Sequence, residues 1–251
     1  MPACRDNMFA DKPRDEVRVE STMTMHRAGG RWVRLTVDGR EAVLDAAAQA
    51  FARHGLVVFP TETFYGLAVP ATDYGALERL VALKAREPGK PIPVIAASRA
   101  DVERIGEVPA AVESLIRAFW PGPLTIAILP TGEWPRVLLG NGRDIGVRVA
   151  GHALARELAA LAGGLITATS ANFGGRPAAA RPDELDPELL RQVDVVIDAG
   201  ACSGGLPSTV VAATQSGAVE VRRPGAVATS ELARLIGYTP RVKSPTSASK
   251  H

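Results

Sequence analysis

The residue types with the clearest chemical potential lie in short polar segments that follow apolar runs. The first segment, Thr61-Glu62-Thr63, comes directly after the apolar run LVVFP at 56–60. Hydroxyls and a carboxylate at the end of a strand lie where α/β sheets usually bind ligands. A polar turn between two strands explains the same segment equally well. Thr63 is therefore a candidate ligand contact, with an ordinary turn as the alternative.

Three cations lie within seven residues at the end of an expected helix: Lys84, Arg86 and Lys90. A Pro-Gly pair at 88–89 stops this helix, so that Lys84 and Arg86 can converge. Such a group can bind a polyphosphate, since hydrogen bonds to charged groups contribute about 1.5–3 kcal/mol each. Cations in a last helical turn also complement the helix dipole, and for this segment alone that explanation is the commoner one.

A single arginine, Arg148, interrupts the apolar run IGVRV at 145–149. A central strand rarely tolerates an unpaired charge. Either Arg148 belongs to an edge strand that faces water, or it reaches a carboxylate or a phosphate in a cleft. Asp144 is a candidate structural partner for it. The segment WPGP at 120–123, in contrast, predicts a rigid turn with a structural role.

Two further segments combine polar side chains with residues that let a ligand approach the backbone. Ser170 and Asn172 follow an expected strand at 165–168, where small side chains suit a phosphate; an ordinary Ser/Asn turn is the commoner alternative. Ser208 begins an expected strand after a Gly-Gly pair. Arg223 precedes a proline and is therefore held extended. The alternative for this last pair is a hairpin with cations at its end.

The elements that must position these residues alternate between helix and strand. Helices are expected at 43–54, from Asp73 to the Pro-Gly stop at 88–89, after Ser98, and at 109–120, 152–162 and 229–237; strands are expected at 56–60, 92–96, 124–129, 145–149, 165–168, 194–198, 208–213 and 218–223. Gly55 is expected to close the first helix in a left-handed conformation. This order, with its strand-rich last third, predicts an α/β domain with a mixed sheet. The sequence contains neither a Rossmann nor a Walker phosphate motif.

Composition narrows the class of protein. The formal net charge of 251 residues is only +2, which argues against a surface that grips nucleic acid everywhere. Two distant cysteines and four scattered histidines form no disulfide framework or metal pattern. There is no apolar run long enough for a membrane span and no signal peptide, so we expect a cytoplasmic protein. We expect a disordered extension at 1–31, a catalytic domain at 32–238 and a flexible tail at 239–251.

Each segment is weak evidence alone, but their combination and order are specific. The segments are spread over about residues 40–227 in the order PTETFYGL, K-x-R, WPGPLT, VRV, TSAN, GG-x-PSTVV and RRPG. Together they resemble the threonylcarbamoyl-AMP synthase family, which has a YrdC-like domain. This resemblance implies a twisted mixed sheet flanked by helices around a basic concave cleft. It also implies an enzyme that makes threonylcarbamoyl-AMP and pyrophosphate from L-threonine, bicarbonate and ATP.

The resemblance further implies a pathway and a set of site residues. The product serves N6-threonylcarbamoyladenosine formation at position 37 of tRNA, through a downstream threonylcarbamoyl-transferase complex, and tRNA itself is a possible partner. Mg²⁺ accompanies the ATP, and no dedicated metal cage is implied. Contacts to threonine fall on Thr63, Arg148 and Ser208. Contacts to ATP fall on Lys84, Arg86, Lys90, Ser170, Asn172 and Arg223, and the catalytic residues among all of these are Lys84, Arg86 and Arg148.

Two departures from the family pattern leave amino-acid selectivity open. Ile95 stands where many relatives have a histidine, and Ala178 stands where some have a serine. One alternative function is a binding module of the same fold for double-stranded RNA or tRNA, which would bind through shape and phosphates. Another is the related domain that adenylates carbamoyl phosphate, although such proteins carry cysteine clusters that this chain lacks.

Overall fold

Two mixed β-sheets form the framework in the computed structural model, which describes residues 29–35, 39–85, 90–140 and 143–243. The five-stranded sheet has the order β1 (Arg31–Arg34), β10 (Val195–Asp198), β2 (Val57–Phe59), β3 (Gly66–Ala68) and β9 (Thr169–Ser170). The larger sheet has the order β13 (Arg241–Val242), β12 (Val219–Arg223), β11 (Thr209–Ala213), β5 (Leu124–Ile128), β7 (Asp144–Val149), β4 (Val94–Ala96) and β8 (Leu165–Thr167), with β6 (Leu139–Gly140) paired to β7. Both contain parallel and antiparallel pairs, which confirms the predicted mixed α/β class.

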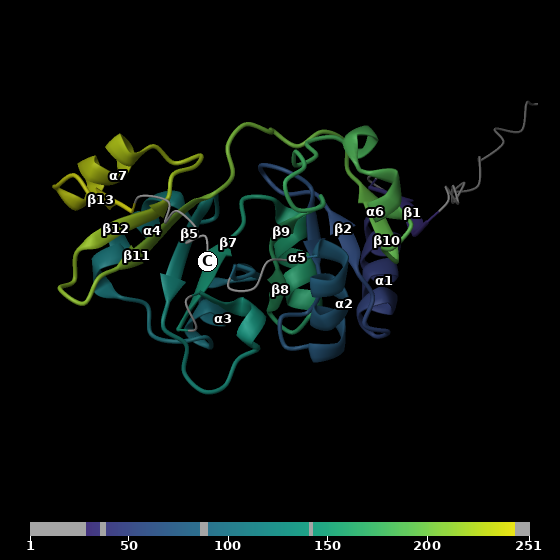
Figure 1. Ribbon diagram of the computed structural model, residues 1–251, viewed down its shortest axis with the longest axis horizontal. Helices are drawn as coiled ribbons and strands as arrows, with labels where there is room; N and C mark the ends of the chain where they lie inside the picture. Colours follow the sequence, from purple (N-terminus) through teal and green to yellow (C-terminus); the bar gives the residue numbers. More distant parts are fainter. Residues whose placement is uncertain (1–28, 36–38, 86–89, 141–142, 244–251) are drawn as a thin grey trace, which may run out of the picture.

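Helices cover the sheets and link the strands. They are α1 (Arg40–Phe51), α2 (Tyr74–Lys84), α3 (Arg99–Glu103), α4 (Glu113–Phe119), α5 (Ala153–Leu161), α6 (Pro187–Leu190) and α7 (Thr229–Ile236), with short 3-10 turns at Ala110–Val112, Arg136–Leu138 and Pro182–Glu184. Figure 1 shows α1, α2 and the five-stranded sheet at one end of the molecule and α7 with β11 and β12 at the other. In the part of the chain that is described, no helix has the length and apolar character needed to cross a bilayer.

Buried strands alternate between two apolar layers. Ile95 and Ile166 pack with α1 and α5 in one layer, whereas Val94 and Leu165, one residue away, pack in the layer that includes α2. Successive side chains of a strand point to opposite faces, so strands covered on both sides must be apolar throughout. This explains why β2, β4, β5 and β8 are continuous apolar or small-residue runs.

One segment of chain belongs to both sheets. Strand β8 ends at Thr167 in the larger sheet, and β9 begins at Thr169 in the five-stranded sheet, with only Ala168 between them. The buried hydroxyl of Thr167 donates to the carbonyl of Leu67 (3.0 Å) and accepts from the amide of Val69 (3.1 Å). The two sheets are therefore joined at the place where Ser170 is positioned.

Most expected elements are found within a few residues of their predicted ends, and the helices expected from Asp73 and after Ser98 both begin with a side-chain cap. The Asp73 side chain accepts from the amide of Ala76 at the start of α2, and Ser98 accepts from the amide of Asp101 at the start of α3. The expected helix at 109–120 is instead a 3-10 turn followed by α4. Strands β1, β3, β6, β9 and β13 were not expected; β1 includes residue 31, and β13 lies within 239–251.

The prediction of a left-handed cap at Gly55 is wrong. The left-handed residue is His54 (φ 56°), whose ring Nδ1 lies 2.8 Å from the carboxylate of Asp73. Gly55 donates its amide to the carbonyl of Ala50 (2.8 Å). A Cβ atom at Gly55 would lie 2.7 Å from that carbonyl oxygen, so the glycine is needed for close approach rather than for its φ angle.

Candidate active site

The loop between β2 and β3 is organised by the side chain of Thr61. Its hydroxyl donates to the carbonyl of Phe64 (2.7 Å) and accepts from the amides of Thr63 and Phe64 (both 3.2 Å). Hydroxyl-to-backbone bonds of this kind fix a tight turn. The segment is therefore a turn between two strands, as one interpretation of the sequence held, and this turn sets the direction of Glu62 and the buried Thr63.

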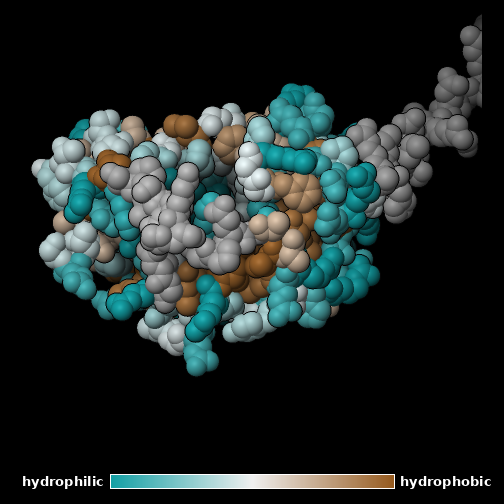
Figure 2. Space-filling view, in the orientation of Figure 1, coloured by the Kyte–Doolittle hydropathy of each residue, from teal (hydrophilic) through white to brown (hydrophobic). Residues whose placement is uncertain are grey.

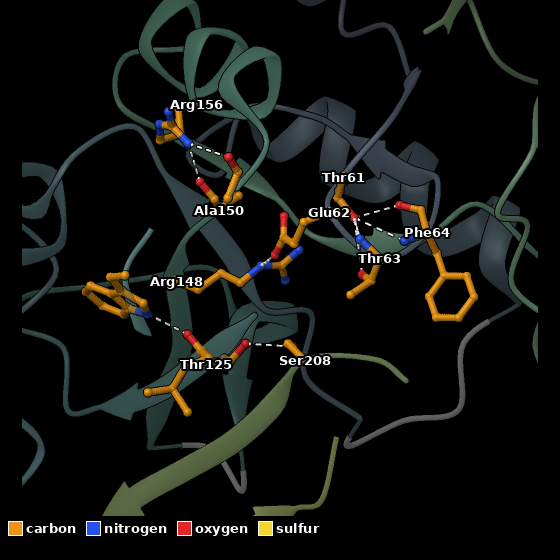
Figure 3. Close-up of polar contacts among 12 residues, drawn as sticks. Thr61, Glu62, Thr63, Phe64, Thr125, Arg148, Ala150, Arg156 and Ser208 are labelled. Atoms are coloured by element: carbon orange, nitrogen blue, oxygen red, sulfur yellow. Dashed lines mark hydrogen bonds and ion pairs between the residues drawn. The ribbon is translucent and has the colours of Figure 1, made fainter. Parts of the chain in front are cut away.

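A buried ion pair joins this loop to strand β7. The guanidinium Nε of Arg148 donates to Oε1 of Glu62 (3.2 Å), and the two side chains are only 7% and 16% exposed. Figure 3 shows the two side chains pointing toward one another. The suggested partner Asp144 is wrong: it pairs with Arg222. Residues four apart on a strand lie about 13 Å from each other along the chain, too far for a direct ion pair.

Two hydroxyls and a second arginine lie beside Arg148 in the larger sheet. The Oγ1 of Thr125 on β5 is 2.8 Å from the Oγ of Ser208, and Arg223 Nη2 donates to the carbonyl (2.8 Å) and the hydroxyl (3.1 Å) of Ser208. Figure 3 shows Thr125 and Ser208 next to Arg148. We call the set Glu62, Thr125, Arg148, Ser208 and Arg223 the Arg148 group.

Electrostatics of the Arg148 group favour an anion. Burial, and then the positive charge of Arg148, lower the pKa of Arg223 from its ordinary value. A guanidinium stays protonated in proteins even so. The group thus contains two cations, the buried Arg148 and the more exposed Arg223, and only one carboxylate, Glu62, which pairs with Arg148, so it carries an excess of positive charge.

A second group lies at the end of helix α2. The buried ammonium of Lys84 donates to the carbonyl of Ser170 (2.9 Å), to Oδ1 of Asn172 (2.8 Å) and to the carbonyl of Asn172. The hydroxyl of Ser170 also donates to Oδ1 of Asn172 (2.6 Å). We call Lys84, Ser170 and Asn172 the Lys84 group. Its cation is directed into the protein and shapes the turn after β9.

The loop at 61–65 connects the two groups. Gly66 pairs with Ser170 between β3 and β9, and the amide of Ala171 donates to the carbonyl of Tyr65 (2.8 Å). On the other side, the amide of Gly204 donates to the carbonyl of Thr63 (2.8 Å). The structure therefore brings together Arg148, Ser208 and Arg223 in one group and Lys84, Ser170 and Asn172 in the other, with Thr63 between them.

Three further sequence predictions concern the cations Arg86 and Lys90, the position of Ile95, and the basic cleft. Lys90 is exposed, and Arg86 lies outside the described residues. Ile95, at the position of the relatives' histidine, is fully buried among apolar residues of α1 and α5 and makes no polar side-chain contact. The basic concave cleft stays a prediction; on the face drawn in Figure 2, the middle of the molecule shows both a small hydrophilic area and a larger hydrophobic one.

Tyr65 anchors the segment that leads to Ser208. Its hydroxyl donates to the carbonyl of Gly200 (2.7 Å) and accepts from the amide of Ala199 (3.3 Å). Burial raises its pKa to about 12, so the hydroxyl remains a donor across the physiological range. Cys202 lies in the same segment, and burial raises the pKa of its thiol as well. A thiol of this kind is a poor nucleophile.

Sequence reasoning did not select Glu62, Thr125 or His152. The first two lie inside the motifs PTETFYGL and WPGPLT, so their segments were known but their partners were not. His152 follows the strand that carries Arg148; burial lowers its pKa, and the charge of Glu62 opposes that shift. Within the described ranges, Glu62 Oε2 and His152 Nδ1 are buried without a hydrogen-bond partner, and three or more metal-ligating side chains do not cluster anywhere.

The fold defines a mixed α/β protein, and the two groups of cationic and hydroxyl side chains are its candidate site for an anionic ligand. The chain belongs to the Sua5/YciO/YrdC family, whose model, described as "Telomere recombination", matches residues 49–225.

Proteins similar in sequence carry the name threonylcarbamoyl-AMP synthase. That of Pyrococcus abyssi is 35% identical over 192 residues, which are 76% of this chain and 56% of that protein. That of Stenotrophomonas maltophilia is 36% identical over 173 residues, covering 66% of this chain and 90% of that protein. The chain thus spans little more than half of the archaeal relative and nearly all of the bacterial one.

Solved structures show the same fold. P. abyssi Sua5 complexed with L-threonine has a TM-score of 0.78 and 31% identity, covering 86% of this chain and 65% of that chain. Escherichia coli YciO has a TM-score of 0.68 and 25% identity, covering 78% and 94%. The predicted fold class is therefore confirmed by both the strands themselves and these neighbours.

Proposed function

We propose that this protein is an L-threonylcarbamoyladenylate synthase, which forms threonylcarbamoyl-AMP and pyrophosphate from L-threonine, bicarbonate and ATP for tRNA modification. The observation that supports the proposal is that the Arg148 group and the Lys84 group lie on either side of the loop at 61–65. The Arg148 group offers positive charge and hydroxyl groups, which suit the binding of a small amino acid. The Lys84 group shapes a polar turn that suits a nucleotide. Relatives of the same family carry this name, and one binds L-threonine.

The chemistry requires positioning more than covalent catalysis. The threonine amine forms a C–N bond with bicarbonate as a C–O bond breaks and water leaves, which gives a carbamate. The carbamate carboxylate then attacks the α-phosphorus of ATP while pyrophosphate leaves. Cations that offset the charge of the transferring group and hold an unstable carbamate lower the barrier. Arg148, Lys84 and Arg86 are proposed for this role, with Lys84 acting through the turn that it orders. No nucleophilic side chain is needed, in keeping with the raised pKa of the Cys202 thiol.

Substrate contacts are proposed residue by residue. Thr63, Arg148 and Ser208 contact threonine. Arg86, Lys90, Ser170, Asn172 and Arg223 contact ATP, and Lys84 belongs to the ATP site through its hydrogen bonds to Ser170 and Asn172. Mg²⁺ accompanies the triphosphate, whose own oxygens are the hard ligands that this ion prefers. Residues 32–238 form the catalytic unit. The enzyme works in the cytoplasm, and a threonylcarbamoyl-transferase complex takes its product to tRNA.

A product assay tests the proposal directly. Purified protein is incubated with ATP, Mg²⁺, bicarbonate and one of several amino acids, and the products are identified by mass spectrometry. We expect a threonylcarbamoyl adenylate and pyrophosphate that require threonine and bicarbonate together. Absence of the adduct with every amino acid contradicts the proposal. Salt-sensitive binding of structured RNA without any adduct would support the RNA-binding alternative instead.

A further inference from the structure

Glu62 is a largely buried carboxylate that accepts a hydrogen bond at only one of its two oxygens. Its Oε1 accepts from Arg148 Nε at 3.2 Å. Its Oε2 is buried and has no partner among the residues that the structure describes. A buried acceptor left without a donor costs free energy, so such an atom in a functional region points to a ligand that supplies the donor.

The position of Glu62 is set by the turn at Thr61 and by the hydrogen bond from Arg148. Its stem lies beside Gly151, where an added Cβ atom would be in ordinary van der Waals contact with Glu62 Cβ (3.5 Å) and with Gly122 Cα (3.6 Å). The amide of Gly122 in turn donates to the carbonyl of Val149 (2.8 Å). A carboxylate held in this way needs little rearrangement to bind a partner, which strengthens recognition.

Arg148 is also only partly used. A guanidinium has five N–H donors, and within the described residues only Nε of Arg148 makes a hydrogen bond. The bond that Arg148 Nε donates to Glu62 fixes the plane of the guanidinium and leaves both Nη atoms for a ligand. Arg148 thus offers hydrogen-bond donors to a ligand, and Glu62 offers an acceptor.

His152 adds a second unused polar atom at this place. Its Nδ1 is buried without a partner in the described part of the chain, and its charge state is coupled to Glu62. Burial keeps the ring neutral, so one ring nitrogen is an acceptor. A ligand group with several N–H donors matches an unused carboxylate oxygen beside a neutral imidazole.

We propose that Glu62 binds the α-ammonium group of the amino-acid substrate through Oε2, while Arg148, oriented by Oε1, binds the α-carboxylate. A zwitterionic α-amino acid presents these two charges side by side, in the same arrangement as the Arg148–Glu62 pair. Carboxylation removes two protons from the ammonium nitrogen, one released to solvent before attack and one lost with the water that leaves. The substrate nitrogen then keeps one N–H, whose bond Oε2 still accepts. The inference rests on the proposed function, because it names how that same site selects an α-amino acid.

Three ligands separate ammonium binding from orientation of Arg148. They are L-threonine, 3-hydroxybutyrate, which lacks the ammonium group, and threoninol, which lacks the carboxylate. Binding to wild type and Glu62→Gln is measured without ATP, by calorimetry for threonine and by ligand-observed NMR for the weaker ligands. We expect Glu62→Gln to weaken threonine and threoninol by about 10- to 100-fold and to leave 3-hydroxybutyrate unchanged.

Other patterns overturn the inference. If Glu62→Gln weakens threonine and 3-hydroxybutyrate but not threoninol, Glu62 only orients Arg148. If all three ligands bind as to wild type, Glu62 has no part in recognition. Glu113→Gln is the matched control, because that carboxylate bonds to Arg99 (2.6 Å) outside the site and its loss should change none of the three affinities.

A crystal structure of the wild-type protein with threonine gives a test that needs no variant. We expect Glu62 Oε2 within about 3.2 Å of the threonine nitrogen, and a separation beyond about 4 Å overturns the inference. The proposed function fails separately: wild type that binds threonine in this way but makes no adenylate contradicts the reaction and not the binding mode. Wild type that makes adenylate with Glu62 remote from the nitrogen contradicts only the binding mode.

Discussion

The Arg148 group and the Lys84 group use buried cations in opposite ways. The ammonium of Lys84 donates to three oxygens of Ser170 and Asn172, so its charge is directed at the protein's own backbone and side chains. The guanidinium of Arg148 makes one hydrogen bond among the described residues and leaves its Nη donors unused. Cations that look alike in the sequence thus have different tasks: one shapes the site, and the other is available to a ligand.

The largest expected effect comes from removing the available cation. Arg148→Ala should lower kcat/KM for threonine by about 100- to 1,000-fold, since it removes charged hydrogen bonds to substrate. Pyrophosphate release by the purified variant measures this. Arg99→Ala, which removes a surface partner of Glu113, is the control and should keep wild-type activity. Near-normal rates for Arg148→Ala would show that this residue has no part in the mechanism and that the two groups do not differ in this way.

Removing the inward cation should act first on stability. Lys84→Met takes a donor from three oxygens, and we expect a loss of about 2–3 kcal/mol in the free energy of unfolding without ligand. Urea denaturation measures the loss. The exposed Arg117→Met should change stability by less than about 0.5 kcal/mol. If Lys84→Met is as stable as wild type but has lost ATP binding, Lys84 is a direct ligand contact and the comparison is wrong.

The hydroxyl of Ser208 should matter less than either cation. Ser208→Ala removes the contacts to Thr125 Oγ1 and to Arg223 Nη2, but Arg223 keeps its bond to the carbonyl of residue 208. We expect about a tenfold higher KM for threonine, with kcat within a factor of about two. The exposed Ser216→Ala is the control. An unchanged KM would place Ser208 outside the substrate contacts.

The smallest effect is a pH dependence of stability at His152. Burial lowers the pKa of the folded-state ring below its ordinary value of 6.5, so the unfolded chain binds a proton more readily. Stability is therefore lost as pH falls below about 6.5. Between about pH 7 and pH 5, the melting temperature of His152→Gln should fall less than that of wild type, as calorimetry can show. Identical slopes would show that His152 charges freely in the folded protein.

Sequence reasoning located most of the framework because buried strands are visible as apolar runs. The runs that became β2, β4, β5 and β7 are three to six residues long and carry their own signal. Strands β3 and β9, with the sequences GLA and TS, are too short to be recognised as apolar runs. They exist only because β3 pairs with β9 and with β2. Tertiary context decides such strands, and local propensity does not.

For the site, motifs supplied residue types but not partners. Glu62 and Arg148 are 86 positions apart, and only the register of the sheets and the turn at Thr61 bring them together. Asp144, the candidate partner named from the sequence, instead forms an ion pair with Arg222. The direction in which Lys84 points could not be predicted either, since it depends on the path of the chain after β9.

The passage of the chain through Ala168, from one sheet directly into the other, has a mechanical consequence. A strand that ends in one sheet and resumes in the next after one residue cannot act as a loose hinge, so the polar turn after β9 must follow any rotation of β4 and β8. Loss of the Thr167 hydroxyl, which bonds to Leu67 and Val69, should therefore disturb the turn after β9 and the β4–β8 pairing as one cooperative unit.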